Sequence, residues 1–300
     1  MKRFGFKMKG GRRGGARPQS RRRFRLRRGE GGGVPLKALV PNLVTSVAAC
    51  AGITSISLSS EGRFHEAQIA ILIACVCDGI DGRIARLLKA SSRLGAELDS
   101  LADFVNFGVA PALFMYYWLT GGPAHAGFEN SPYVIRAALG CSLFYAMCDC
   151  FRLARFNTML EETPLPYWKN YFTGVPAPGG CWMLLTPYLL LTTLEAEKNF
   201  PAAHAFFSSP AFGMAMLLFT GMLMASRLPT ISLKAVHVSK SAQRPVVAGG
   251  LLLVGCLFAN LWLTLGVIGA LYILSVPVSA AMFAKTKNDY EKKTEKDVSQ

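Results

Sequence analysis

The sequence predicts an all-α protein, a polytopic integral membrane bundle of about eight transmembrane helices in a lipid bilayer. Hydrophobic residues make up 51% of the 300 residues and the mean hydropathy is +0.31, which is more apolar than a typical soluble domain with so basic a terminus. The apolar residues also form long blocks, each able to cross a membrane as a helix. Helices are expected in these blocks because a helix satisfies its own backbone hydrogen bonds in lipid.

Residues 1–37 are predicted to form a disordered cytoplasmic tail, because they are rich in Gly and Arg and lack aliphatic periodicity. They contain 14 of the 33 Lys and Arg residues and only one acidic residue, Glu30. Such a tail fits a polybasic arm on anionic lipid headgroups, an RNA-binding segment or an organellar transit peptide. We favour the lipid-binding arm and expect no nucleic-acid partner.

Eight apolar segments follow this tail. The expected spans are residues 39–60, 66–88, 95–119, 133–156, 171–194, 209–227, 246–265 and 267–285. The last two are expected to meet in a tight hairpin around Gly266. If the N-terminus is cytoplasmic, 16 of the 19 Lys and Arg residues beyond the tail lie on the cytoplasmic side, in agreement with the positive-inside rule. The sequence therefore predicts a multi-pass protein with both termini in the cytoplasm.

Four carboxylates interrupt the second and third apolar segments. Asp78 and Asp81 are three residues apart, and Asp99 and Asp103 are four apart, so each pair lies on one face of a helix. If the chain reverses near Ser92, two antiparallel helices bring the pairs together, with Asp81 and Asp103 at the same level. Ionised groups at that depth are costly unless they pair, contact water or bind a cation. Hard oxygen ligands favour Mg²⁺ or Mn²⁺ over Zn²⁺, so we expect a divalent metal site.

The spacing of this hairpin is specific. It reads Asp78-x2-Asp81-Gly82-x2-Ala85-Arg86-x8-Gly95-x3-Asp99-x3-Asp103. The pattern resembles the signature of the CDP-alcohol phosphatidyltransferases, which are integral membrane enzymes that make phospholipids. Every fixed position of that signature is present in this sequence. The resemblance implies a six-helix catalytic core in which the hydroxyl of an acceptor alcohol attacks the lipid-side phosphorus of CDP-diacylglycerol and displaces CMP. A divalent cation suits that reaction, because negative charge accumulates on the leaving CMP oxygen.

The resemblance also implies roles for individual residues. The expected metal ligands, for two Mg²⁺ or Mn²⁺ ions, are Asp78, Asp81, Asp99 and Asp103. Asp103 is in addition the expected general base. The expected nucleotide and diphosphate site comprises Asn42, Thr45, Gly82, Ala85, Arg86 and Gly95. Other roles stay open: close helix packing for Gly82 and Ala85, snorkelling for Arg86 and helix N-capping for Asn42.

Segments outside the hairpin bear on the acceptor. Residues 103–111, 152–157, 172–178 and 226–230 resemble the phosphatidylserine synthase branch of the family, which implies L-serine as the acceptor. Arg152 and Arg155 lie one turn apart at the cytoplasmic end of the fourth span, where they are expected to bind the serine carboxylate. Lys234 is a third candidate for acceptor binding. The same arginines also fit positive-inside anchoring, and an arginine pair would equally suit the phosphate of glycerol 3-phosphate.

The expected organisation is a basic tail (1–37), a catalytic core (38–235), a C-terminal transmembrane helix pair (236–285) and a cytoplasmic tail (286–300). The active site is expected at the cytoplasmic face, of the inner membrane if the protein is bacterial, and the resemblance suggests a homodimer. Transfer to glycerol 3-phosphate, choline or inositol phosphate is the alternative within this enzyme class. An ion transporter with intramembrane carboxylates is the alternative outside it.

Overall fold

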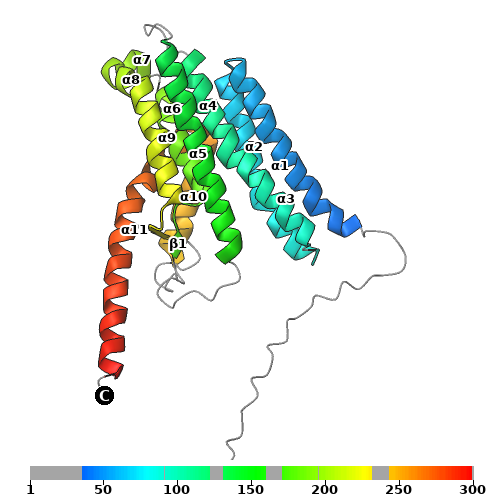
Figure 1. Cartoon of the computed structure of the whole chain (residues 1–300), viewed down its shortest axis with the longest axis vertical. Coiled ribbons are helices and arrows are strands. Elements are labelled where there is room, and N and C mark those ends of the chain that lie inside the picture. The colour runs from blue at the N-terminus through cyan, green and yellow to red at the C-terminus, as the bar shows by residue number, and fades with distance from the viewer. Residues whose placement is uncertain are drawn as a thin grey trace, which may run out of the picture. The chain divides into compact units, whose positions relative to one another are not determined.

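The computed structural model describes residues 36–90, 92–121, 131–159, 171–194, 196–231 and 243–298. These ranges form a bundle of helices with one short antiparallel pair of strands (Figure 1). The elements are α1 (Leu36–Ser60), α2 (Phe64–Leu87), α3 (Arg93–Asp103), the π-helix η1 (Phe104–Val109), α4 (Ala110–Gly121), α5 (Pro132–Met159), β1 (Tyr171–Thr173), α6 (Ala177–Thr193), α7 (Ala196–Asn199), α8 (Pro201–Phe207), α9 (Pro210–Ala225), β2 (Pro229–Ile231), α10 (Gln243–Ala259) and α11 (Leu261–Val298).

The predicted all-α membrane fold is confirmed, and each expected span contains a helix. Within the described ranges, four helical segments are long and apolar enough to cross a membrane: Leu39–Ser60, Arg93–Gly121, Pro132–Thr158 and Leu261–Thr286. The pair α8 and α9, bent by 54°, adds a fifth if it is one broken span. Of the other expected spans, α2 carries several charged side chains, and α6 and α10 have 17 residues each. The chain is a multi-pass membrane protein.

The expected hairpin around Gly266 is wrong. The helix break lies at Asn260, between α10 and α11, where the Asn260 side chain accepts a hydrogen bond from the Leu263 amide at 3.0 Å. Asparagine at this position caps the next helix. Gly266 lies inside α11 against Leu190 of α6, where an added Cβ would come within 2.8 Å of the leucine side chain.

Helix α11 packs closely along α6. A Cβ at Gly269 would overlap the Thr186 side chain, and a Cβ at Gly179 would lie 2.8 Å from the Tyr272 hydroxyl oxygen. Small residues thus let the two helix backbones approach each other, as is common between membrane helices. The last long helix therefore covers a face of α6.

The apolar core contains an aromatic cluster at one end of α2. The rings of Phe64, Phe114, Trp118 and Tyr188 meet edge to face, with centroids 4.5 Å apart for Trp118 and Tyr188 and 5.4 Å for Phe64 and Phe114. Edge-to-face contacts of this kind add to the stability gained from burial. Since α2 starts at Phe64 whereas Asp78 and Asp81 lie in its second half, the cluster fixes the end of α2 that is far from the candidate site.

Candidate functional site

The hairpin between α2 and α3 forms where the sequence predicts it. Helix α2 ends in a Schellman motif: the Ala90 amide donates to the Ala85 carbonyl at 2.9 Å, and the Lys89 amide donates to the Arg86 carbonyl at 3.2 Å. Lys89 takes the left-handed position, with φ of 52°, where glycine is usual. Ser92 then caps α3, because its hydroxyl accepts a hydrogen bond from the amide three residues later at 3.0 Å.

Three of the four expected metal ligands come together. Asp78, Asp99 and Asp103 each offer a carboxylate oxygen, and these oxygens lie within 4.8 Å of one another. Asp81 is outside this group, so the expectation that Asp81 and Asp103 stand level is wrong, and Asp78 takes that place. The physical reason is the turn, since the Schellman motif centres the reversal nearer residue 90 than Ser92.

The three carboxylates fit a hard divalent cation. Octahedral Mg²⁺ binds oxygen at about 2.0–2.1 Å, so its ligand oxygens stand roughly 3 Å apart when adjacent and roughly 4 Å apart when opposite. Side-chain rotations would bring three oxygens that lie within 4.8 Å of one another to such spacings. One oxygen of Asp103, Oδ1, is buried and has no hydrogen-bond partner among the residues that the structure describes. A buried, unpaired carboxylate oxygen beside two further carboxylates is stabilised by a cation. The cluster can therefore hold a divalent metal.

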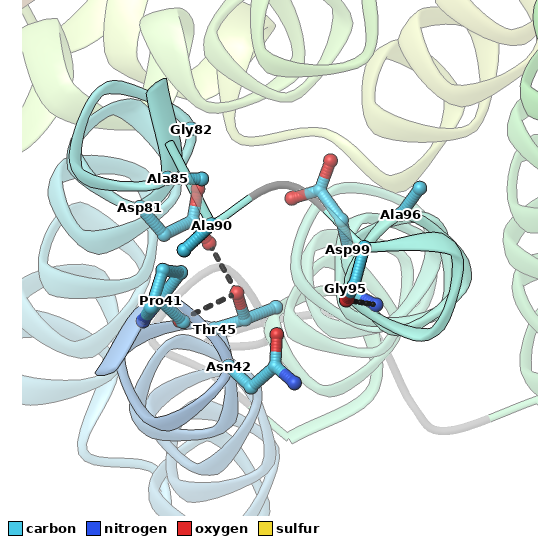
Figure 2. Close-up of a pocket in the computed structure, with 11 residues that line it drawn as sticks. Pro41, Asn42, Thr45, Asp81, Gly82, Ala85, Ala90, Gly95, Ala96 and Asp99 are labelled. Carbon is cyan, nitrogen blue, oxygen red and sulfur yellow. Dashed lines mark hydrogen bonds between the residues drawn. The ribbon is translucent and has the colours of Figure 1, made fainter. Parts of the chain in front are cut away.

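Asp81 contributes to a neighbouring pocket through a hydrogen bond to α1. The Thr45 hydroxyl donates to Oδ2 of Asp81 at 2.6 Å, and both side chains are buried. Figure 2 shows this pair on one side of the pocket and Asp99, from α3, on the other. Thr45 therefore holds one carboxylate oxygen of Asp81 against α1, at the wall of the pocket.

The pocket has a volume of about 160 Å³ and lies between α1, α2 and α3. Its lining consists of Pro41, Asn42, Thr45, Asp81, Gly82, Ala85, Ala90, Ser92, Gly95, Ala96 and Asp99. Five of the six residues expected at the nucleotide site are among them. The sixth, Arg86, is exposed and does not line the pocket, and its Nε donates to the Gly82 carbonyl at 3.0 Å. Ala90, Ser92 and Ala96 could not be assigned to this site from the sequence, because none of them carries a charge that would single it out.

Two glycines and Asn42 acquire clearer roles from the geometry. A Cβ at Gly82 would meet nothing within 4 Å, so this glycine leaves the pocket open and does not serve close helix packing. A Cβ at Gly95 would lie 2.9 Å from Oδ1 of Asn42, so Gly95 lets α1 approach α3. Asn42 is not a helix N-cap, because α1 begins six residues earlier, at Leu36.

Arg155, expected to bind the acceptor, is engaged by the backbone. Its guanidinium donates to the Ala225 and Ser226 carbonyls at 2.9 Å each, and Nη2 lies 3.4 Å from the Thr173 carbonyl. Gly174, with φ of 81°, makes the tight turn beside these contacts. The expected acceptor role conflicts with these contacts, because the guanidinium already caps the end of α9 and holds β1. Lys234, the other outlying candidate, lies outside the described residues.

Arg152 has a different environment, since it lies 3.8 Å from Asp149, one turn earlier on α5. The side chain of Asp149 is fully buried and that of Arg152 is 13% exposed. Asp149 was not among the residues predicted from the sequence, although a carboxylate inside an apolar span is by itself a signal of function.

Comparison with known proteins gives a consistent result. A family model described as CDP-alcohol phosphatidyltransferase matches residues 38–225. A CDP-diacylglycerol–serine O-phosphatidyltransferase of Mycobacterium leprae is 35% identical over 224 residues, which cover 74% of this chain and 64% of that protein. The enzymes of the same name from Mycobacterium tuberculosis and Helicobacter pylori are 36% and 30% identical over 198 residues each, covering 62% and 74% of their own lengths. The match thus spans less than two thirds of the mycobacterial relatives.

Proposed function

This chain belongs to the CDP-alcohol phosphatidyltransferase family, and we propose that it transfers the phosphatidyl group of CDP-diacylglycerol to L-serine, giving phosphatidylserine and CMP. The observation that carries the proposal is the meeting of Asp78, Asp99 and Asp103 beside a pocket that is lined by Asp81, Gly82, Ala85 and Gly95 of the same motif. Serine is chosen as the acceptor because the relatives from both Mycobacterium and Helicobacter carry the name of the serine enzyme.

The donor is assigned to the pocket between α1, α2 and α3. At about 160 Å³ the pocket is smaller than the roughly 300–1,000 Å³ of sites that enclose a whole ligand, so it accommodates only part of the nucleotide headgroup. Asn42, Thr45, Gly82, Ala85 and Gly95 are proposed to contact the nucleotide or diphosphate. Arg86 is proposed to reach a phosphate from the rim, as a side chain exposed next to the pocket.

The four aspartates are proposed to hold two Mg²⁺ or Mn²⁺ ions. When bound, these ions neutralise the diphosphate and stabilise the charge that develops on the leaving CMP oxygen. Thr45 orients one oxygen of Asp81, which leaves its other oxygen free to act as a ligand. Because second-shell hydrogen bonds of this kind set the direction of a ligand, Thr45 belongs to the proposed site.

Asp103 is proposed as the general base. It ends α3, is partly buried, and its Oδ1 has no hydrogen-bond partner in the described part of the chain. It accepts the proton of the serine hydroxyl as the serine oxygen bonds to the lipid-side phosphorus and the phosphorus–oxygen bond to CMP breaks. Proton transfer to a positioned carboxylate lowers the barrier of such a step.

Orientation and assembly are part of the proposal. The excess of Lys and Arg on one side supports cytoplasmic termini and an active site at the cytoplasmic face. For a bacterial protein this is the inner membrane. Family resemblance supports a homodimer.

An acceptor panel tests the proposal. Purified full-length protein is given CDP-diacylglycerol, Mn²⁺ and one of L-serine, glycerol 3-phosphate, choline or inositol 1-phosphate, and CMP release is followed. We expect L-serine to accelerate CMP release and the other acceptors to leave it at the rate seen without acceptor. Acceleration by glycerol 3-phosphate but not by serine would overturn the proposed acceptor.

A further inference from the structure

The chain that follows Asp103 is wound as a π-helix. Helix η1 runs from Phe104 to Val109, so Asp103 is the residue directly before it. The amide of Ala110 donates to the Val105 carbonyl, five residues earlier, which is the hydrogen bond of a π-helix. Such turns are rare, and many of those that occur lie at functional sites. The backbone next to the proposed general base therefore has an unusual conformation.

Pro111 accounts for this winding. In an α-helix the Phe107 carbonyl would accept a hydrogen bond from the amide of residue 111, but proline has no N–H group. The proline ring also clashes with the carbonyl four residues before it, which widens the turn. The Phe107 carbonyl therefore lacks its usual α-helical donor.

Tyr145 of α5 supplies a donor to this carbonyl. Its hydroxyl donates to the Phe107 carbonyl oxygen at 3.0 Å, and both residues are buried. A buried carbonyl and a buried phenol hydroxyl each cost free energy when they have no partner. One hydrogen bond between two helices thus satisfies the hydroxyl and the carbonyl that Pro111 leaves without its amide.

Two further contacts hold the π-helix in place. A Cβ at Gly52 of α1 would overlap the side chain of Asn106, so η1 lies directly against α1. A Cβ at Gly108 would lie 2.8 Å from Oδ2 of Asp149, so α5 contacts η1 at a second point. The π-helix is therefore wedged between α1 and α5, and a change in its winding would have to move it against both.

The position of the Asp103 carboxylate depends on this backbone. Oδ1 of Asp103 is buried and has no hydrogen-bond partner in the described part of the chain, so the backbone at residue 103 decides where this oxygen lies. The Phe107 carbonyl is four residues beyond Asp103, about one helical turn away. Rewinding of that turn would shift Asp103 relative to Asp78, which belongs to the other helix of the hairpin.

We propose that Tyr145 is a positioning residue of the transfer reaction. By holding the Phe107 carbonyl, its hydroxyl keeps η1 in the π-helical conformation and Asp103 within reach of Asp78 and Asp99. This rests on the proposed function, in which Asp103 is a metal ligand and the general base. Tyr145 acts through the backbone and does not contact the substrates. Such positioning matters because a misplacement of about 1 Å can slow a reaction roughly 100-fold.

Tyr145→Phe tests this role in the full-length protein, since it removes the hydroxyl and keeps the ring. We expect kcat with CDP-diacylglycerol and L-serine to fall roughly 10- to 100-fold, with both KM values within about twofold of the wild type. The apparent Kd for Mn²⁺, measured without substrates by electron paramagnetic resonance of free Mn²⁺, should rise roughly 2- to 10-fold, the factor that one hydrogen bond is typically worth. Tyr145→4-aminophenylalanine retains a donor and should restore both values.

Tyr188→Phe is the matched control. Tyr188 is a buried tyrosine of the aromatic cluster, and its hydroxyl has no hydrogen bond within the ranges that the structure describes. This variant should keep the wild-type kcat and Mn²⁺ affinity.

A second substitution separates positioning from stability. Pro111→Ala returns an amide that can donate to the Phe107 carbonyl along the helix. Added to Tyr145→Phe, it should raise the thermal unfolding temperature toward that of the wild type while kcat stays low, because the carbonyl is satisfied and the π-helical winding is not restored. Recovery of kcat together with the unfolding temperature would show that the hydroxyl only satisfies a buried carbonyl, and would refute the positioning role.

The remaining outcomes distinguish this inference from the proposed function. Wild-type protein that releases no CMP with L-serine refutes the proposed function, whereas the Mn²⁺ titration still reports on Tyr145. An active wild type together with a Tyr145→Phe protein that keeps its kcat and Mn²⁺ affinity refutes only the positioning role. If Tyr145→Phe does not fold, Pro111→Ala alone decides, because its new amide competes with Tyr145 for the carbonyl: lowered kcat and Mn²⁺ affinity are expected, and wild-type values refute the role.

Discussion

The hydrogen bond between Thr45 and Asp81 gives a quantitative prediction for metal binding. The bond is short, at 2.6 Å, and joins two side chains that are 5% and 3% exposed. Thr45→Val keeps the shape of the side chain and removes the donor, which leaves a buried carboxylate oxygen free to rotate. Loss of a second-shell partner typically weakens metal binding 10- to 100-fold, or by roughly 1.4–2.7 kcal/mol. We therefore expect the apparent dissociation constant for Mn²⁺ to rise by that factor.

The assay is a Mn²⁺ titration of chelator-treated protein, followed by CMP release and, independently, by electron paramagnetic resonance of free Mn²⁺. Thr45→Ser retains the hydroxyl and should restore binding. Ser46→Ala is the matched control, because the Ser46 hydroxyl donates only to the carbonyl of Asn42, within its own helix, at 2.8 Å. A Thr45→Val protein that binds Mn²⁺ as tightly as the wild type would refute the role of Asp81 as a ligand held by Thr45.

Three further predictions concern the aspartates, the pocket and Arg155. Asp99→Asn should abolish transfer while leaving the thermal unfolding temperature unchanged. EDTA should abolish transfer by the wild-type protein, and added Mn²⁺ or Mg²⁺ should restore it. Turnover after either change would argue against metal dependence. Gly82→Leu should raise the KM for CDP-diacylglycerol at least tenfold with little loss of stability, because a Cβ there meets no neighbour and the added side chain fills the pocket; an unchanged KM would place the donor elsewhere. Arg155→Ala should lower the free energy of unfolding by about 2 kcal/mol, since two 2.9 Å hydrogen bonds to carbonyls are lost, and should leave the KM for serine unchanged. An unchanged free energy of unfolding together with a raised KM for serine would instead support the acceptor role of Arg155.

The hairpin could be predicted from sequence because its determinants are local. The spacing of the aspartates fixes which side chains share a helix face, and Ser92 lies at the start of the next helix as a capping residue usually does. The register between the helices could not be predicted. It depends on Lys89 adopting a left-handed conformation that sequence patterns assign to glycine. For that reason the register predicted from the sequence placed Asp81 level with Asp103, whereas in the structure Asp78 takes that place.

The role of Arg155 could not be predicted because its partners are distant in sequence. The carbonyls that it contacts belong to residues 173 and 224–226, and only the packing of α5 against α9 brings them within reach. An arginine at the end of an apolar span looks the same in sequence whether it anchors the helix, binds a ligand or caps another helix. Asp149 was missed for a related reason, since the significance of its pairing with Arg152 depends on the burial of both side chains.

The packing of α11 on α6 has a consequence for biosynthesis. Thr186 on α6 leaves the ribosome long before Gly269, the residue against which it packs, has been added to the chain. During insertion, that side of α6 must remain in contact with lipid or with the translocation machinery until the last long helix arrives. The hairpin that carries the aspartates can close much earlier, since its two halves are neighbours in the chain. Assembly therefore ends with the docking of α11 on α6, and a prematurely terminated chain would hold its acidic cluster in a bundle in which this face of α6 is still uncovered.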